Sequence, residues 1–114
     1  MGIQEIVKLI DGTIICENSS SDESVSRAFA SDLMSDVLTL NTDSLLLITG
    51  LANLQTVRTA EIADIKNILF VRNKKPSPEM VSIANREGIT IISCSKSMFA
   101  TCGILFGAGI KPVY

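Results

Sequence analysis

Residues 45–49 read LLLIT, an uninterrupted apolar run that ends in a threonine. It carries no charged residue, so a strand formed here has no polar face to turn toward water. Two similar runs follow, each about one helix and its turns further along: ILFVR at 68–72 and TIISC at 90–94. Strands of this kind are typical of parallel sheets with helices on their faces. The sequence therefore predicts an α/β fold built from βαβ units.

The segments that follow these runs have the apolar spacing of amphipathic helices. The expected stripes are Leu54, Val57, Ala60 and Ala63; Met80, Ile83 and Ala84; and Met98, Cys102 and Leu105. Ser77 before Pro78 predicts the start of the second helix, and Gly88 its end. Gly107 and Gly109 come after the last stripe, so this GxG ends a helix, whereas a phosphate-binding glycine loop precedes one.

The first 40 residues are less regular. We expect a helix over 3–10, a short strand TIIC at 13–16 and a second strand VSRAFA at 25–30. The stretch 17–24, ENSSSDES, has no apolar residue and is expected to be a mobile loop within one domain spanning 1–114.

Asp32 and Asp36 lie four residues apart, just behind the second strand. On a helix starting near Ser31 they would share a face, where Mg²⁺ is conceivable. The favoured interpretation is a Ser31 cap with Asp32 in the first turn and Asp36 exposed. We therefore assign no metal site.

Composition excludes several classes of protein. The 114 residues carry a formal charge of −2, so no strong positive field is available for DNA or RNA. No apolar run approaches the roughly 20 residues that span a membrane, and the first residues do not resemble a secretory signal. We expect a cytoplasmic protein that uses its 46% hydrophobic residues in a core or a subunit interface. The three cysteines are expected to be reduced and structural.

The chain has no histidine, which excludes Ser-His-Asp and Cys-His catalysis and histidine-containing zinc sites. Neither glycine fingerprint for nucleotides is present. We therefore predict a protein that is not an enzyme and needs no cofactor.

The carboxyl ends of parallel strands are where open α/β sheets bind ligands. Here these ends offer hydroxyls, amides and cations suited to a small anionic molecule; the candidate residues are Thr49, Gly50, Arg72, Asn73, Lys74, Lys75, Ser93 and Ser95. The alternative is that Gly50 and Asn73 only form turns and the lysines only solvate a loop. Cys94, near Lys96, is either a reactive thiol or a buried strand-end thiol.

Several ordered blocks carry a resemblance to the DRTGG domain family. They are FASDLMSDVL, SLLLITGL, AEIADIKNILFVRNKKPSPEMVSIANREGITIIS and SMFATCGIL, from about Ala28 to Tyr114. The resemblance implies a three-layer α/β/α fold with a mostly parallel sheet, similar to the N-terminal domain of HPr kinase/phosphorylase. It also implies an accessory module, one that contributes to dimer contacts in some pyrophosphatases, and it carries over no catalytic residue.

The chain departs from the motif that names the family. Gly50-Leu51-Ala52-Asn53 stands where the family has Asp-Arg after the strand-end glycine, and Val71-Arg72-Asn73 stands where it has Thr-Gly-Gly.

The leading hypothesis is a non-enzymatic regulatory or adaptor module that forms a homodimer through an apolar patch and binds a small anionic ligand at the strand ends. The alternative is a sensor of a nucleotide or phosphorylated metabolite that acts on a partner redox or phosphotransfer protein. Neither hypothesis involves nucleic acid or a membrane.

Overall fold

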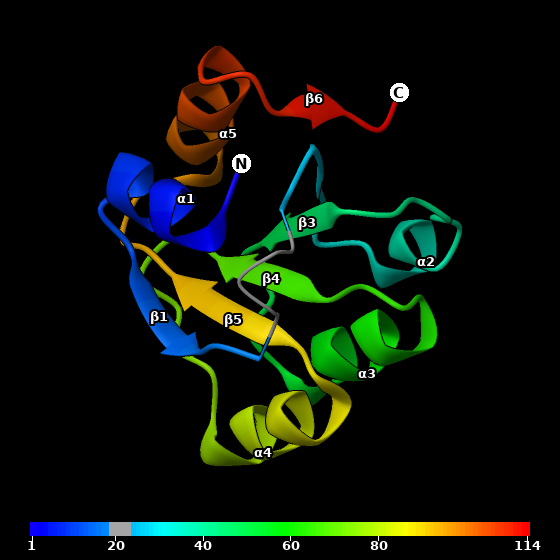
Figure 1. Cartoon of the computed structure of the whole chain (residues 1–114). Helices are drawn as coiled ribbons and strands as arrows, with labels where there is room; N and C mark the ends of the chain where they lie inside the picture. Colours follow the sequence, from blue (N-terminus) through cyan, green and yellow to red (C-terminus); the bar gives the residue numbers. More distant parts are fainter. Residues whose placement is uncertain (19–23) are drawn as a thin grey trace.

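The computed structural model describes residues 1–18 and 24–114, and it is a three-layer α/β/α structure (Figure 1). Its six-stranded sheet has the order β1-β5-β4-β3-β2-β6. All neighbouring strands are parallel except β1 and β5. The strands are β1 (Thr13–Cys16), β2 (Arg27–Ala30), β3 (Leu45–Thr49), β4 (Asn67–Phe70), β5 (Thr90–Ser93) and β6 (Lys111–Pro112), and the helices are α1 (Ile3–Ile10), α2 (Met34–Val37), α3 (Leu54–Ile62), α4 (Pro78–Glu87) and α5 (Met98–Gly107).

The three apolar runs form the central strands, as predicted. Every residue of β3, β4 and β5 is buried. Successive side chains of a strand point to opposite faces of the sheet, so each strand contributes side chains to the hydrophobic cores on both faces. In β3, Leu45 and Leu47 join the core under α2, α3 and α4, whereas Leu46 and Ile48 join the core under α1 and α5.

The order of connections explains which helix covers which face. From β2 to β5 the chain steps across the sheet in one direction, and α2, α3 and α4 all lie on the same face. After β5 the chain reverses and crosses back over the sheet to the outer side of β2, where β6 pairs with β2. Because parallel crossovers keep one hand, this return places α5 on the opposite face. The chains leaving the adjacent strands β4 and β5 therefore part to opposite faces of the sheet.

Local signals in the sequence set most helix ends. Ser77 accepts a hydrogen bond from the backbone N–H of Met80 at 3.3 Å and starts α4, and Gly88 ends it with φ 73°. Ser97 starts α5 in the same way, and Gly109 follows its end with φ 109°. The predicted signals at Ser77, Gly88 and Gly109 are confirmed, whereas the Ser97 cap was not predicted.

The predicted helix start at Ser31 is wrong. Helix α2 begins at Met34, and its N-cap Leu33 makes no side-chain capping bond. The Ser31 backbone N–H donates instead to the Ile48 carbonyl at 3.0 Å, which extends the contact between β2 and β3. The Ser31 hydroxyl accepts a hydrogen bond from the Leu33 backbone N–H at 3.0 Å, which closes a local turn ahead of the helix. Asp32 therefore lies in this turn, and Asp32 and Asp36 do not share a helix.

The last strand of the sheet is a finding of the structure. The sequence pattern did not predict β6, which is only two residues long and contains a proline.

Most of the loop expected to be mobile, residues 19–23, lies outside the described residues. No helix in the described part of the chain is long and apolar enough to cross a membrane.

Candidate functional site

The strands β3, β4 and β5 are parallel, so the loops that follow them meet along the edge of the sheet formed by the carboxyl ends of the strands. The Arg72 backbone N–H donates to the Lys96 carbonyl at 2.8 Å, and that of Asn73 donates to the Cys94 carbonyl at 2.8 Å. These two bonds tie the β4–α4 loop to the β5–α5 loop where their chains part to opposite faces. Such a point, where neighbouring strands send their chains to opposite faces, is the usual place for a ligand in an open α/β sheet.

Arg72 lies across the end of β3. A Cβ atom added to Gly50 would come within 2.6 Å of its Nη2 atom, so the absence of a side chain at Gly50 makes room for the guanidinium. The Gly50 residue itself is buried and Arg72 is exposed. The guanidinium therefore connects the end of β3 with the loop after β4 and keeps a side open to solvent.

Arg72 and Asn73 both have a left-handed backbone, with φ of 59° and 58°. Glycine adopts this conformation without cost, whereas other residues pay roughly 1–2 kcal/mol, with asparagine the least penalised. The backbone at these two positions is one that glycine favours. Strain of this kind is often held at functional sites.

Asp32 is part of this edge, although it was expected to start a helix. Its Oδ1 atom accepts hydrogen bonds from the Thr49 hydroxyl and the Gly50 backbone N–H, both at 2.8 Å. Ala30 is paired with Ile48 in the parallel register, so Asp32 and Gly50 are two residues beyond a matched pair. The Gly50 amide, predicted to face a ligand, is thus already bonded by the protein.

The predicted ligand residues divide into two groups. Thr49 and Ser93 are buried and point into the structure. The remaining side chains of the set are exposed: Arg72, Asn73, Lys74, Lys75 and Ser95. Sequence reasoning left Lys96 out of the set, although its backbone contacts Arg72. Lys96 lies two residues after the third apolar run, which ends at Cys94, and this position could have placed it in the predicted ligand set.

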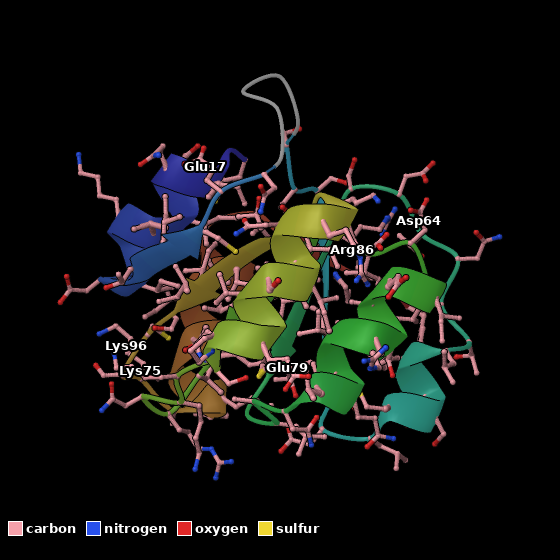
Figure 2. The ribbon with its side chains drawn as sticks, turned by 90° about the horizontal axis from the view of Figure 1, so that it is seen from below. Glu17, Asp64, Lys75, Glu79, Arg86 and Lys96 are labelled. Carbon is pink, nitrogen blue, oxygen red and sulfur yellow. The ribbon has the colours of Figure 1, made fainter. Side chains whose placement is uncertain are left out.

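We call Arg72, Lys74, Lys75 and Lys96 the cationic rim. In the view of Figure 2, Lys75 and Lys96 lie on the same side of the molecule. Within the described ranges, the ion pairs join Lys66 to Asp64 and Arg86 to Glu87, so no rim cation has a carboxylate partner. The rim is a positive surface on a chain whose formal charge is −2.

The thiols and carboxylates offer little chemistry at this edge. Cys94 is buried, with its Sγ atom 3.5 Å from the Thr101 hydroxyl. Burial raises the pKa of the Cys16 and Cys102 thiols, which keeps them protonated and weakly nucleophilic at neutral pH. No three His, Cys, Asp or Glu residues of the described segments come together as a metal site.

Two cavities lie elsewhere on the molecule, and no rim residue lines either of them. One, of about 270 Å³, lies between α5 and the strands β2 and β6. The other, of about 200 Å³, lies at the opposite edge of the sheet, where β3 and β4 begin. At the rim itself, the exposed cations are the feature that would attract a ligand.

Comparisons with known proteins concern the fold. No family model matches the chain, and no curated protein matches it. Among solved structures, the chain is similar to the CBS and DRTGG domains of the regulatory region of Clostridium perfringens pyrophosphatase, complexed with the activator diadenosine tetraphosphate, with a TM-score of 0.73 and 11% identity. The match covers 98% of this chain and 48% of that chain, so the chain spans about half the length of its structural neighbour. The likeness shows a shared fold.

Proposed function

We propose that this chain is a single non-enzymatic regulatory domain that binds a small anionic ligand on the cationic rim. The observation that carries the proposal is the position of the rim. Four cations without a carboxylate partner in the described segments stand where the chains leaving β4 and β5 diverge. This combination of topology and charge favours an anion over a neutral ligand.

The surrounding backbone supports the same class of ligand. Helix α5, of 10 residues and with no acidic side chain in its first turn, begins directly after one rim loop. Helix α4 follows the other rim loop, and Glu79 in its first turn offsets part of the positive charge there. The N-terminus of a helix carries a partial positive charge that adds to that of the side chains. A compact polyanion such as a phosphorylated metabolite matches this arrangement better than a single carboxylate, because four cations can share its charge.

The structural neighbour supports a regulatory role. Its description is that of a regulatory region with a nucleotide activator bound. Because this chain corresponds to about half of that region, the neighbour does not locate a ligand on this chain. A nucleotide or phosphorylated metabolite is the ligand class we propose, and a redox or phosphotransfer protein is the class of partner that such a sensor would control.

Thermal unfolding in the presence of inorganic pyrophosphate tests the proposal. At about 100 times its dissociation constant, a ligand adds roughly 2.7 kcal/mol to the free energy of unfolding. We expect stabilisation of the wild-type chain and none of a Lys74→Ala/Lys75→Ala variant. Lys66→Ala is the matched control, because Lys66 is paired with Asp64 at the opposite edge. Equal stabilisation of all three proteins would contradict a site at the rim.

A second proposal is that the domain forms a homodimer through exposed apolar side chains. Large side chains reach solvent at several places, most strongly at Phe99, which is 91% exposed. Helix α5 has no charged residue at all, which is typical of a helix that is covered on all sides. A two-fold contact over α5 would cover it. We expect sedimentation to give a dimer at micromolar concentration and a monomer for Phe99→Asp; a monomeric wild type would contradict the dimer.

A further inference from the structure

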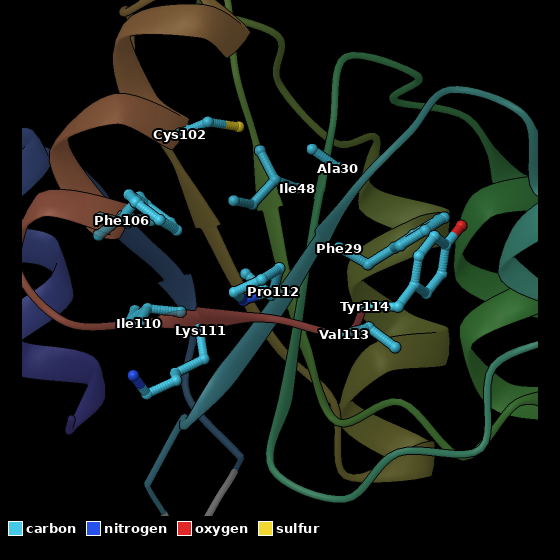
Figure 3. A pocket seen from close by; sticks show the side chains of 12 residues that line it. Phe29, Ala30, Ile48, Cys102, Phe106, Ile110, Lys111, Pro112, Val113 and Tyr114 are labelled. Atoms are coloured by element: carbon cyan, nitrogen blue, oxygen red, sulfur yellow. The ribbon is translucent and has the colours of Figure 1, made fainter.

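The cavity between α5, β2 and β6 has an apolar interior. Its floor is formed by the small side chains Ala28 and Ala30 together with Ile48, and its wall by Cys102 and Phe106 of α5. The segment 110–114 closes the remaining side. Figure 3 shows these side chains around the open space, with Cys102 at one end and Ile110 at the other.

The cavity exists because part of the sheet has no helix over it. On this face α1 and α5 cover the sheet, and the core they form includes residues of β3, β4 and β5. Strand β2 contributes Ala28, a side chain too small to fill the space beside α5. A volume of about 270 Å³ is left open. An opening of this size loses van der Waals contacts unless something fills it.

Phe106 gives the cavity an aromatic wall on the α5 side. The ring is 69% exposed. Phe29 borders the cavity too, but its side chain joins the core on the opposite face of the sheet, where the Tyr114 ring lies against it with the centroids 6.2 Å apart. An aromatic face at the mouth of a cavity favours another aromatic ring, stacked or edge-on.

Charge narrows the ligand class further. Lys111 is the charged residue among those lining the cavity, and Figure 3 shows its amino group pointing away from the other side chains. A charged ligand would have to lose its hydration shell there without a partner, which is costly. An uncharged ligand has no such cost. Pockets for drug-sized molecules span roughly 300–1,000 Å³, so this volume suits a smaller molecule of one or two rings.

We propose that this cavity binds an uncharged, planar aromatic ring or ring pair. The site is separate from the cationic rim, because no rim residue lines it. It therefore goes beyond the proposed anion binding, and its occupancy should not depend on salt concentration. Binding would fill the space over Ala28 and Ala30 and cover the face of Phe106.

Indole is the probe for this site. In an NMR titration of the whole chain, we expect indole to shift the backbone amides of 28–30, 102–106 and 110–112, except the proline, and the ring signals of Phe106. A ligand with so few atoms should bind with a dissociation constant in the millimolar range. Cyclohexanol, which is apolar but not planar, should bind far more weakly. Absent shifts, or equal binding of cyclohexanol, would overturn the proposal.

Two variants and a control locate the site. Phe106→Ala should weaken indole binding roughly fivefold by removing an aromatic contact, and Ala30→Leu should abolish it by filling the floor. Both positions are exposed, so the fold should survive the changes. Ile62→Ala is the control, because Ile62 is 74% exposed on α3, away from both the cavity and helix α5. Equal weakening by Ile62→Ala would contradict the site. Shifts of the floor residues Ala28 and Ala30 that depend on protein concentration without indole would assign the space to a second copy and overturn the proposal.

Discussion

Asp32 shows how a residue can take a role that its local sequence does not suggest. Its carboxylate bonds the hydroxyl of Thr49 and the amide of Gly50, and Gly50 in turn lies under the Arg72 guanidinium. The carboxylate thus holds the end of β3 in place beside the rim. Its negative charge opposes the binding of an anion there.

Asp32→Asn should therefore affect stability and binding in opposite directions. The asparagine oxygen can still accept both hydrogen bonds, but without charge assistance, so we expect unfolding to cost about 1 kcal/mol less. Removing one negative charge near the rim should tighten pyrophosphate binding about twofold at low salt. Denaturant unfolding and calorimetric titration measure the two effects.

Asp36→Asn is the control for the Asp32 variant. It removes the same charge from an exposed helix position, and we expect little change in either quantity. If both variants changed binding equally, the effect would come from net charge and not from the position of Asp32.

At the scale of elements, the β4–α4 loop combines strain with charge. Two successive residues have a left-handed backbone, and the first of them is the arginine that reaches over Gly50. A glycine would suit the backbone better at Arg72 but would remove the guanidinium. The loop is therefore less stable than it could be, a common cost of a binding site.

Replacing Arg72 separates these two contributions. Arg72→Ala removes the charge and keeps the left-handed strain, whereas Arg72→Gly removes both. We expect the glycine variant to be more stable than the alanine variant by about 1 kcal/mol, after allowing for the greater freedom of glycine in the unfolded chain. Both variants should bind pyrophosphate more weakly than the wild type. An alanine variant as stable as the glycine variant would show that the loop is not strained.

Elements with strong local signals were predictable from the sequence. The strands β3, β4 and β5 follow from their uninterrupted apolar runs, and α4 follows from Ser77, Pro78 and Gly88. Helix α2 was predicted to start too early, because the Ser31 amide continues the pairing with β3 and the Ser31 hydroxyl closes a turn at Leu33 before the helix begins. Strand β6 has two residues and one proline, too short for any periodicity to show.

At the scale of the whole molecule, the candidate site was predictable in outline only. Parallel strands bring their carboxyl ends together, so the sequence placed Arg72, Lys74, Lys75 and Ser95 at one edge. The contact of Arg72 with Gly50 depends on strand order, as does the bond from Asp32 to Gly50, and order is not encoded in any local pattern. The aromatic cavity was missed for the same reason, since its walls come from β2, α5 and the segment 110–114.

Strand order also determines where on the molecule the cationic rim lies. Because the chain reverses direction after β5, α4 and α5 lie on opposite faces and the loops before them part at the rim. The same reversal leaves β2 without a covering helix on the α5 side. One topological feature thus accounts for both the charged surface and the apolar cavity.

Chemical-shift mapping with inorganic pyrophosphate would show whether the cationic rim binds an anion. We expect saturable shifts confined to the backbone amides of 72–75 and 95–97, weakening as ionic strength rises and lost in Lys74→Ala/Lys75→Ala. Shifts spread over the surface without saturation, or centred on residues away from these two loops, would contradict it.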